Sequence, residues 1–97
     1  MWASGWSAAA AQAGWQSFAI RRLDQEVWGV GVVQKATAWV NPETILTLPT
    51  GWWPTGLAAA QQRLGDVTVD AMADGRVRMR AAGGPGVTAI GFHYILG

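Results

Sequence analysis

The stretch "DVTVDAMADGRVRMRA", residues 66–81, decides the fold because apolar and polar side chains alternate on both sides of a turn. Alternation with a period of two is typical of a half-buried β-strand. Two turn lengths fit this stretch, and the register that each imposes decides which side chains share a face of the sheet. A two-residue turn at Asp74 and Gly75 would put Val69 opposite Arg80, so that apolar and charged groups were mixed on both faces.

A three-residue loop over residues 73–75 separates the two kinds of side chain. Such a loop is built from a type I turn followed by a glycine in the left-handed conformation. We therefore predict a hairpin with this loop and with positive φ at Gly75. If the Asp70–Arg78 pair of this hairpin is exposed, it contributes about 0.2–1 kcal/mol and helps the register more than the stability. The predicted apolar face pairs Val67, Val69 and Ala71 with Ala81, Met79 and Val77, and the polar face pairs Thr68 with Arg80, Asp70 with Arg78 and Met72 with Arg76.

The rest of the chain shows the same organisation of short apolar segments between turn signals. About seven strands at this spacing predict an all-β protein, a small antiparallel β-sandwich of jelly-roll-like form. The predicted strands are residues 15–22, 26–35, 43–48, 57–63, 66–72, 76–81 and 87–96. The residues expected to shape turns include Pro49, Gly51, Pro54, Asp74 and Gly75.

Residues 7–14, "SAAAAQAG", depart from this pattern. A serine N-cap, an alanine run and a glycine stop favour a helix of about one and a half turns, although so short a helix is marginal without packing. An extended leader is the equal alternative. We therefore divide the chain into an N-terminal leader or docking segment, 1–14, and a β-sandwich domain, 15–97.

Two predicted strands are apolar on both faces. In residues 87–96, one face carries Ile90, Phe92 and Tyr94, and the other face is also largely apolar. Such a strand is expected to be buried on both sides, in the middle of a sandwich or between subunits. In residues 26–35, Gly29 and Gly31 leave one side nearly bare, which permits close approach of a backbone or a large side chain.

The composition predicts association with other protein. A chain of 97 residues is one small domain, and only 13% of these residues are charged, against about 25% in ordinary soluble proteins. Hydrophobic residues make up 51%, and seven residues are tryptophan. No apolar run reaches the roughly 18 residues of a membrane-spanning helix, so we expect no membrane partner. The net charge is +1 and the seven basic residues are scattered along the chain, which argues against a nucleic-acid partner.

The sequence offers no catalytic pattern. The only histidine is His93, in an apolar strand, and no GxSxG elbow exists. The carboxylates of Asp24, Asp66 and Asp74 fall at expected turns, where they ordinarily bind backbone amides. His93 could hold a metal only if a threefold axis brought three copies together. We expect no enzyme activity, no cofactor and no metal site, and the absence of cysteine excludes disulfides.

The order of several motifs along the chain indicates a resemblance to a known family. The segments "ILTLPTGWWPTG" (45–56), "VDAMADGRVRMRA" (69–81) and "TAIGFHYIL" (88–96) follow one another in the chain. Together with "VWGVGVV" (27–33), this set resembles the C-terminal head domains of bacteriophage tail fibres and receptor-binding proteins, over about residues 15–96. The resemblance implies a homotrimeric, non-enzymatic β-sandwich on the virion surface, often in contact with the host.

A fibre normally has a long N-terminal shaft, whereas this chain opens at Met1 with a short leader. The chain is therefore expected to be an excised head or a free-standing protein, and a capsid decoration or minor capsid protein at threefold positions is the alternative.

The tryptophans are the candidate contact residues. In the family's L-P-x-G-[YW]-x-P pattern the first aromatic packs the loop onto the sandwich, which implies a structural role for Trp52 and leaves Trp53 freer. Trp53 could contact another virion protein or stack on a host surface glycan, so a carbohydrate-binding module is a third possible function. We expect Trp2 and Trp6 to dock the domain to a trimer mate or a larger scaffold.

Overall fold

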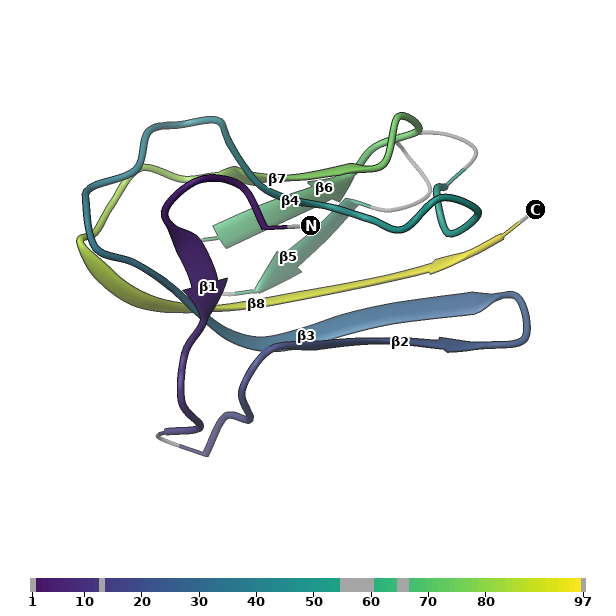
Figure 1. Cartoon of the computed structure of the whole chain (residues 1–97), viewed down its shortest axis with the longest axis horizontal. Helices are drawn as coiled ribbons and strands as arrows, with labels where there is room; N and C mark the ends of the chain where they lie inside the picture. The colour runs from purple at the N-terminus through teal and green to yellow at the C-terminus, as the bar shows by residue number, and fades with distance from the viewer. Residues whose placement is uncertain (1, 13, 55–60, 65–66, 97) are drawn as a thin grey trace.

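A computed structural model of the chain describes residues 2–12, 14–54, 61–64 and 67–96. These residues form β-strands and no helix, and the strands build two antiparallel sheets that face each other (Figure 1). The predicted all-β sandwich is thereby confirmed. The described residues contain no helix able to span a membrane. The strands are β1 (Trp6–Ala8), β2 (Ala19–Leu23), β3 (Glu26–Lys35), β4 (Glu43–Thr47), β5 (Gln61–Leu64), β6 (Val67–Ala71), β7 (Arg76–Arg80) and β8 (Gly86–Ile95).

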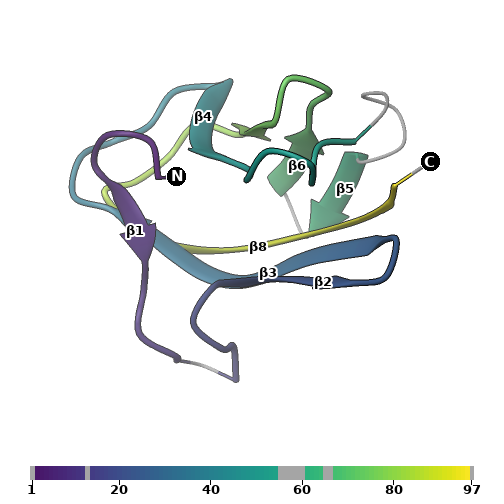
Figure 2. The same cartoon turned by 45° about the vertical axis from the view of Figure 1, so that its right-hand side comes forward.

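The two sheets differ in how they are built. In the first, which we call the β3 sheet, β3 pairs along its whole length with β8, while β2 and β1 pair with its N-terminal and C-terminal parts. In the second, the β7 sheet, the strand order is β4-β7-β6-β5. Figure 2 shows the β7 sheet above the β3 sheet in the turned view, with β5 and β6 lying over β8.

The β6–β7 hairpin has the predicted register. Val69 lies opposite Met79 and Asp70 lies opposite Arg78, as the three-residue loop requires. Gly75 has φ of +90°, in the left-handed region. Val69 and Met79 are almost completely buried, so the apolar face of the hairpin is the face that meets the core.

Most strand limits agree with the sequence pattern. The strand predicted at 26–35 is β3 itself, and β8 begins one residue before its predicted start. The first predicted strand, 15–22, is shorter in the structure because β2 begins at Ala19. Of the predicted strand 57–63, residues 57–60 lie outside the described part of the chain.

The core fills the space between the inner faces of both sheets. Gly29 provides room there, because a Cβ atom on this residue would lie 2.3 Å from Cζ of Phe92. A Cβ atom on Gly31 would lie 2.5 Å from Cα of Phe18. The predicted close approach at both glycines is confirmed. The buried cluster consists of Trp6, Phe18, Val27, Val33, Trp39, Ile45, Leu46, Leu48, Val69, Ala71, Val77, Met79, Ile90, Phe92 and Tyr94.

The N-terminal segment is extended. No helix occurs in the described residues of 7–14, and Trp6–Ala8 instead forms β1 against the end of β3. The amide of Ala9 continues this contact by donating to the carbonyl of Val32 at 3.0 Å. Pairing with β3 and burial of an indole stabilise the extended form, whereas an isolated helix of under two turns gains little.

Candidate functional site

The outer face of the β3 sheet exposes large apolar side chains. In the register of this sheet, Leu23, Glu26 and Ile95 form one cross-strand row and Arg21, Trp28 and His93 form the next. Side chains in such rows share a face, and residues two apart along a strand share it as well. We call the outer face of the β3 sheet the apolar face. Its large exposed apolar residues are Leu23 (73% exposed), Trp28 (48%), Val30 (38%), Val87 (43%) and Ile95 (60%).

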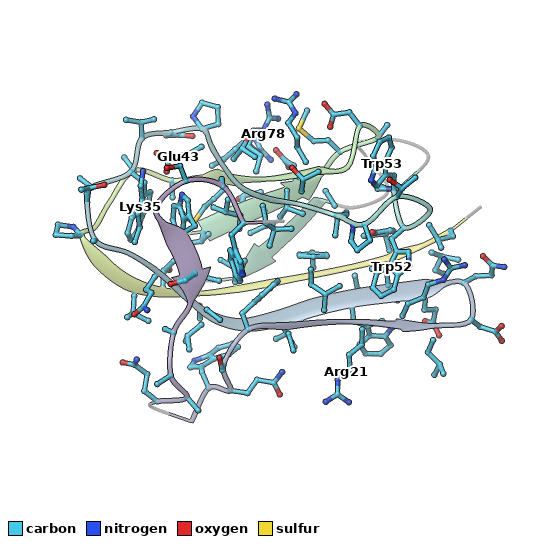
Figure 3. All side chains as sticks on the ribbon, in the orientation of Figure 1. Arg21, Lys35, Glu43, Trp52, Trp53 and Arg78 are labelled. Atoms are coloured by element: carbon cyan, nitrogen blue, oxygen red, sulfur yellow. The ribbon has the colours of Figure 1, made fainter. Side chains whose placement is uncertain are left out.

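The apolar face points away from the rest of the sandwich. Figure 3 shows the Arg21 side chain projecting from the β3 sheet on the side opposite to the β7 sheet. The described part of the segment between β1 and β2 extends on this same outer side (Figure 1). There Gln16, Ala19, Arg21, Leu23, Trp28 and Val30 line a groove of about 400 Å³.

A few polar groups interrupt the apolar face. Nε2 of His93 lies 3.1 Å from Oε1 of Glu26, and the His93 ring lies 4.8 Å from the indole of Trp28. Arg21 forms no ion pair with any residue that the structure describes. The face therefore combines aliphatic and indole surface with the Glu26 carboxylate, which His93 contacts, and with a guanidinium that has no ion-pair partner among the described residues.

Strand β8, which is apolar on both faces, is buried on one face only within a single chain. Its inner residues Ile90, Phe92 and Tyr94 belong to the core, while Val87 and Ile95 are exposed. The prediction of burial in the middle of a sandwich is wrong for the described part of the chain, where a second sheet covers β8 on its inner side alone. Burial between subunits stays a prediction. The signal for the apolar face was present in the alternation of residues 87–96, although reasoning from the sequence placed the contact residues elsewhere.

The two adjacent tryptophans both pack against their own chain, from the loop after β4 (Figure 3). Trp52 is partly buried against the core, and its carbonyl accepts a hydrogen bond from the Tyr94 hydroxyl. Nε1 of Trp53 donates to the carbonyl of Leu48 at 3.0 Å, and the Trp53 ring covers Gly75. Trp53 keeps 38% of its surface exposed, but its one polar hydrogen is already used inside the chain.

The predicted turn residues around these tryptophans shape the loop. The amide of Trp52 donates to the carbonyl of Pro49 at 3.1 Å, and Gly51 between them has φ of +92°. A positive φ at the third position is the signature of a type II turn. Pro54, which follows the two tryptophans, is buried.

The tryptophans of the N-terminal segment are also held within the chain. Trp6 is only 4% exposed and packs on Trp39 with ring centroids 5.2 Å apart, while Trp2 is partly buried and meets Phe18 edge-on at 5.6 Å. The predicted docking of Trp6 against another chain is therefore replaced by a core position in its own chain. The core of so small a domain is limited in size, and the Trp6 indole is part of it.

One carboxylate links the N-terminal segment to both sheets. Oε2 of Glu43 accepts from Nε1 of Trp6 at 2.7 Å and from Nζ of Lys35 at 2.6 Å, and Oε1 accepts from the Val40 amide at 3.1 Å. Burial alone would raise the pKa of Glu43, but the hydrogen bonds from Lys35, Val40 and Trp6 outweigh burial and lower the pKa from its ordinary value. The cluster has a structural role, because hydrogen bonds from Trp6, Lys35 and Val40 all end on the carboxylate of Glu43.

No candidate metal site is found among the residues that the structure describes. None of their histidine and carboxylate side chains gather in groups of three or more that could hold a metal ion. Comparisons with protein-family models, with curated proteins and with solved structures gave no match for this chain. The apolar face, with five large apolar side chains exposed, is the observation on which a functional proposal can be based.

Proposed function

We propose that the chain is a non-enzymatic structural protein of a bacteriophage virion, a β-sandwich of the tail-fibre or receptor-binding head type. It acts as a homotrimer displayed on the particle surface, and the apolar face is the surface through which its copies associate. Two observations support the proposal. The order of motifs in residues 15–96 resembles that of phage fibre heads, and the apolar face leaves large side chains exposed in the single chain.

The size of the hydrophobic term makes association favourable. Complete burial of one valine, leucine or isoleucine side chain stabilises by about 1.5–3 kcal/mol. The exposed parts of the five residues on the apolar face therefore offer several kcal/mol for each copy. Association costs about 4–15 kcal/mol in lost translational and rotational freedom. The free energy gained when several copies bury this face together is large enough to offset that cost.

The polar groups of the face suit a partner of the same sequence. Arg21 and Glu26 lie on neighbouring strands of one face, in adjacent cross-strand rows. When two copies of the face meet, Arg21 of one copy can approach Glu26 of the next, where the carboxylate already contacts His93. An opposite charge supplied across the contact limits the desolvation penalty of the guanidinium.

The place of the chain on a particle is tested with purified phage from the source that carries the gene. We expect peptides of this chain in the mass spectrum of gradient-purified particles, and labelling of intact particles by an antibody against the folded chain. Labelling at the fibre tip would support the receptor-binding type, and labelling over the shell would move the assignment to capsid decoration. Recovery of the chain only outside the particles would contradict the proposal.

A further inference from the structure

The outer face of the β7 sheet gathers positive charge. In β7 the arginines alternate with Val77 and Met79, both of which are completely buried in the core. Arg76, Arg78 and Arg80 therefore share the opposite side of the strand. Figure 3 shows Arg78 on the side of this sheet that faces away from the β3 sheet. The basic residues that are scattered along the sequence are thus partly concentrated by the fold.

Two of these arginines converge on one buried carboxylate. Asp70 is 0% exposed; its Oδ2 lies 2.9 Å from Nη2 of Arg78 and 2.9 Å from Nε of Arg80, and Nη2 of Arg80 donates to Oδ1 at 3.2 Å. One carboxylate offsets one guanidinium, so the group of three carries a net positive charge. The side chains of Arg78 and Arg80 remain 27% and 39% exposed. Both guanidinium groups are therefore fixed in place with part of their surface open to an outside anion.

Hydroxyl groups stand beside the arginines. The register places Thr44 opposite Arg78 and Thr68 opposite Arg80. A threonine hydroxyl both donates and accepts hydrogen bonds, as the hydroxyls of a sugar do. Within the described part of β4, β6 and β7, the strands carry no aromatic side chain on which a nucleobase could stack.

We infer that the outer face of the β7 sheet binds an acidic polysaccharide, with a carboxylate or sulfate group held by Arg78 and Arg80. Guanidinium groups bind such oxyanions through paired, charge-assisted hydrogen bonds. Because Asp70 already fixes both arginines, they lose little side-chain freedom when the anion arrives. The site lies on the sheet opposite to the apolar face, and the inference stands whether or not the chain is a virion protein.

The test measures binding of heparin, a sulfated polysaccharide, by isothermal titration calorimetry at low salt. We expect Arg80→Gln to weaken heparin binding about tenfold, since the variant loses a charge-assisted hydrogen bond to the anion. Arg22→Gln removes the same charge from β2, outside this face, and is the matched control. Failure of the wild-type chain to bind heparin, or equal weakening by Arg22→Gln, would overturn the inference.

A second variant separates binding from folding. Asp70→Asn removes the competing negative charge and keeps an oxygen that can accept from the arginines, so we expect tighter heparin binding with thermal unfolding still cooperative. A damaged fold could not produce this gain at an intact melting transition. Weaker binding by a folded Asp70→Asn variant, or equally tight binding of single-stranded DNA, would reject the acidic polysaccharide as the ligand.

Discussion

Gly75 shows at the scale of one residue how the hairpin and the tryptophan loop depend on each other. Its positive φ followed from the alternation of the flanking strands, because only a three-residue loop separates apolar from charged side chains. The Trp53 ring over Gly75 did not follow from the sequence. That contact joins two loops distant along the chain, and local patterns carry no information about such a meeting.

A pair of glycine variants measures this contact. At Gly51, with φ of +92° and no atom within 4 Å of an added Cβ, substitution by alanine meets backbone strain alone, about 1–2 kcal/mol. At Gly75 the added Cβ also meets the Trp53 indole at 2.3 Å, and overpacking costs about 1–3 kcal/mol more. Urea unfolding at one protein concentration should show Gly75→Ala as the less stable variant. Equal losses would mean that the ring does not constrain the turn.

Tyr94 provides a spectroscopic probe, because it is the only tyrosine in the chain. Burial raises the pKa of Tyr94 from 10.0 to about 12, while the charge of Arg22 acts in the opposite direction. The unfolded chain loses the phenolic proton first, so stability that is present below about pH 10 is lost as the pH rises toward about 12. Phenolate absorbance should titrate near pH 12 in the folded chain, and Tyr94→Phe should lack this part of the alkaline loss of stability. Titration near pH 10 in the folded chain would contradict the buried position.

At the scale of the elements, period-two alternation predicted the long strands and failed at the N-terminal segment. The limits of β3 follow from an apolar run between turn residues, and the β6–β7 register follows from the separation of charge. The alanine run suggested a helix as readily as an extended leader, because local propensity favours helix there. Burial of Trp6 and pairing of β1 with β3 outweigh that propensity, and both are long-range contacts.

Glu43 is the residue that holds β1, β3 and β4 together, and acid should weaken this tie. Its pKa is lowered in the folded chain, so its contribution is present above about pH 4.5 and is lost as the pH falls through the folded pKa. We expect Glu43→Gln to be less stable by about 1 kcal/mol near neutral pH and to show a smaller acid-induced loss than the wild type. Chemical denaturation at several pH values measures both effects.

Asp24→Asn is the control for the Glu43 variant, since Asp24 is an exposed carboxylate in the β2–β3 turn. This control should keep the acid dependence of the wild-type chain. An unchanged acid dependence in Glu43→Gln would show that the carboxylate does not tie the N-terminal segment to the sandwich.

At the scale of the whole molecule, the sequence has few charged residues, and the apolar face is a part of the surface that they do not cover. The composition indicated that part of the surface is covered by protein, but it could not say which part, because that depends on how the strands pair. Among the described residues, five of the eight exposed large apolar side chains lie on the outer side of β2, β3 and β8. Trp28 contributes more to this exposed area than Trp2, Trp6, Trp52 and Trp53, the tryptophans predicted as contact residues.

Two valine variants test whether the apolar face is the association surface. Val30 lies on the face and Val40 is exposed outside it, at 38% and 64% respectively. We expect Val30→Lys to give a monomer, because like charges would be brought together and desolvated in the contact. Val40→Lys introduces the same charge and should leave the oligomer intact. Circular dichroism melting checks that both variants are folded, and an oligomer unaffected by Val30→Lys would place the contact elsewhere.

The most direct test of self-association is the mass of the wild-type chain by sedimentation equilibrium at several concentrations. We expect trimer formation, with a species of three times the 10.3 kDa chain mass. A chain that stays at 10.3 kDa up to the highest soluble concentration would contradict it, since the apolar face would then be stable in water without a copy to cover it.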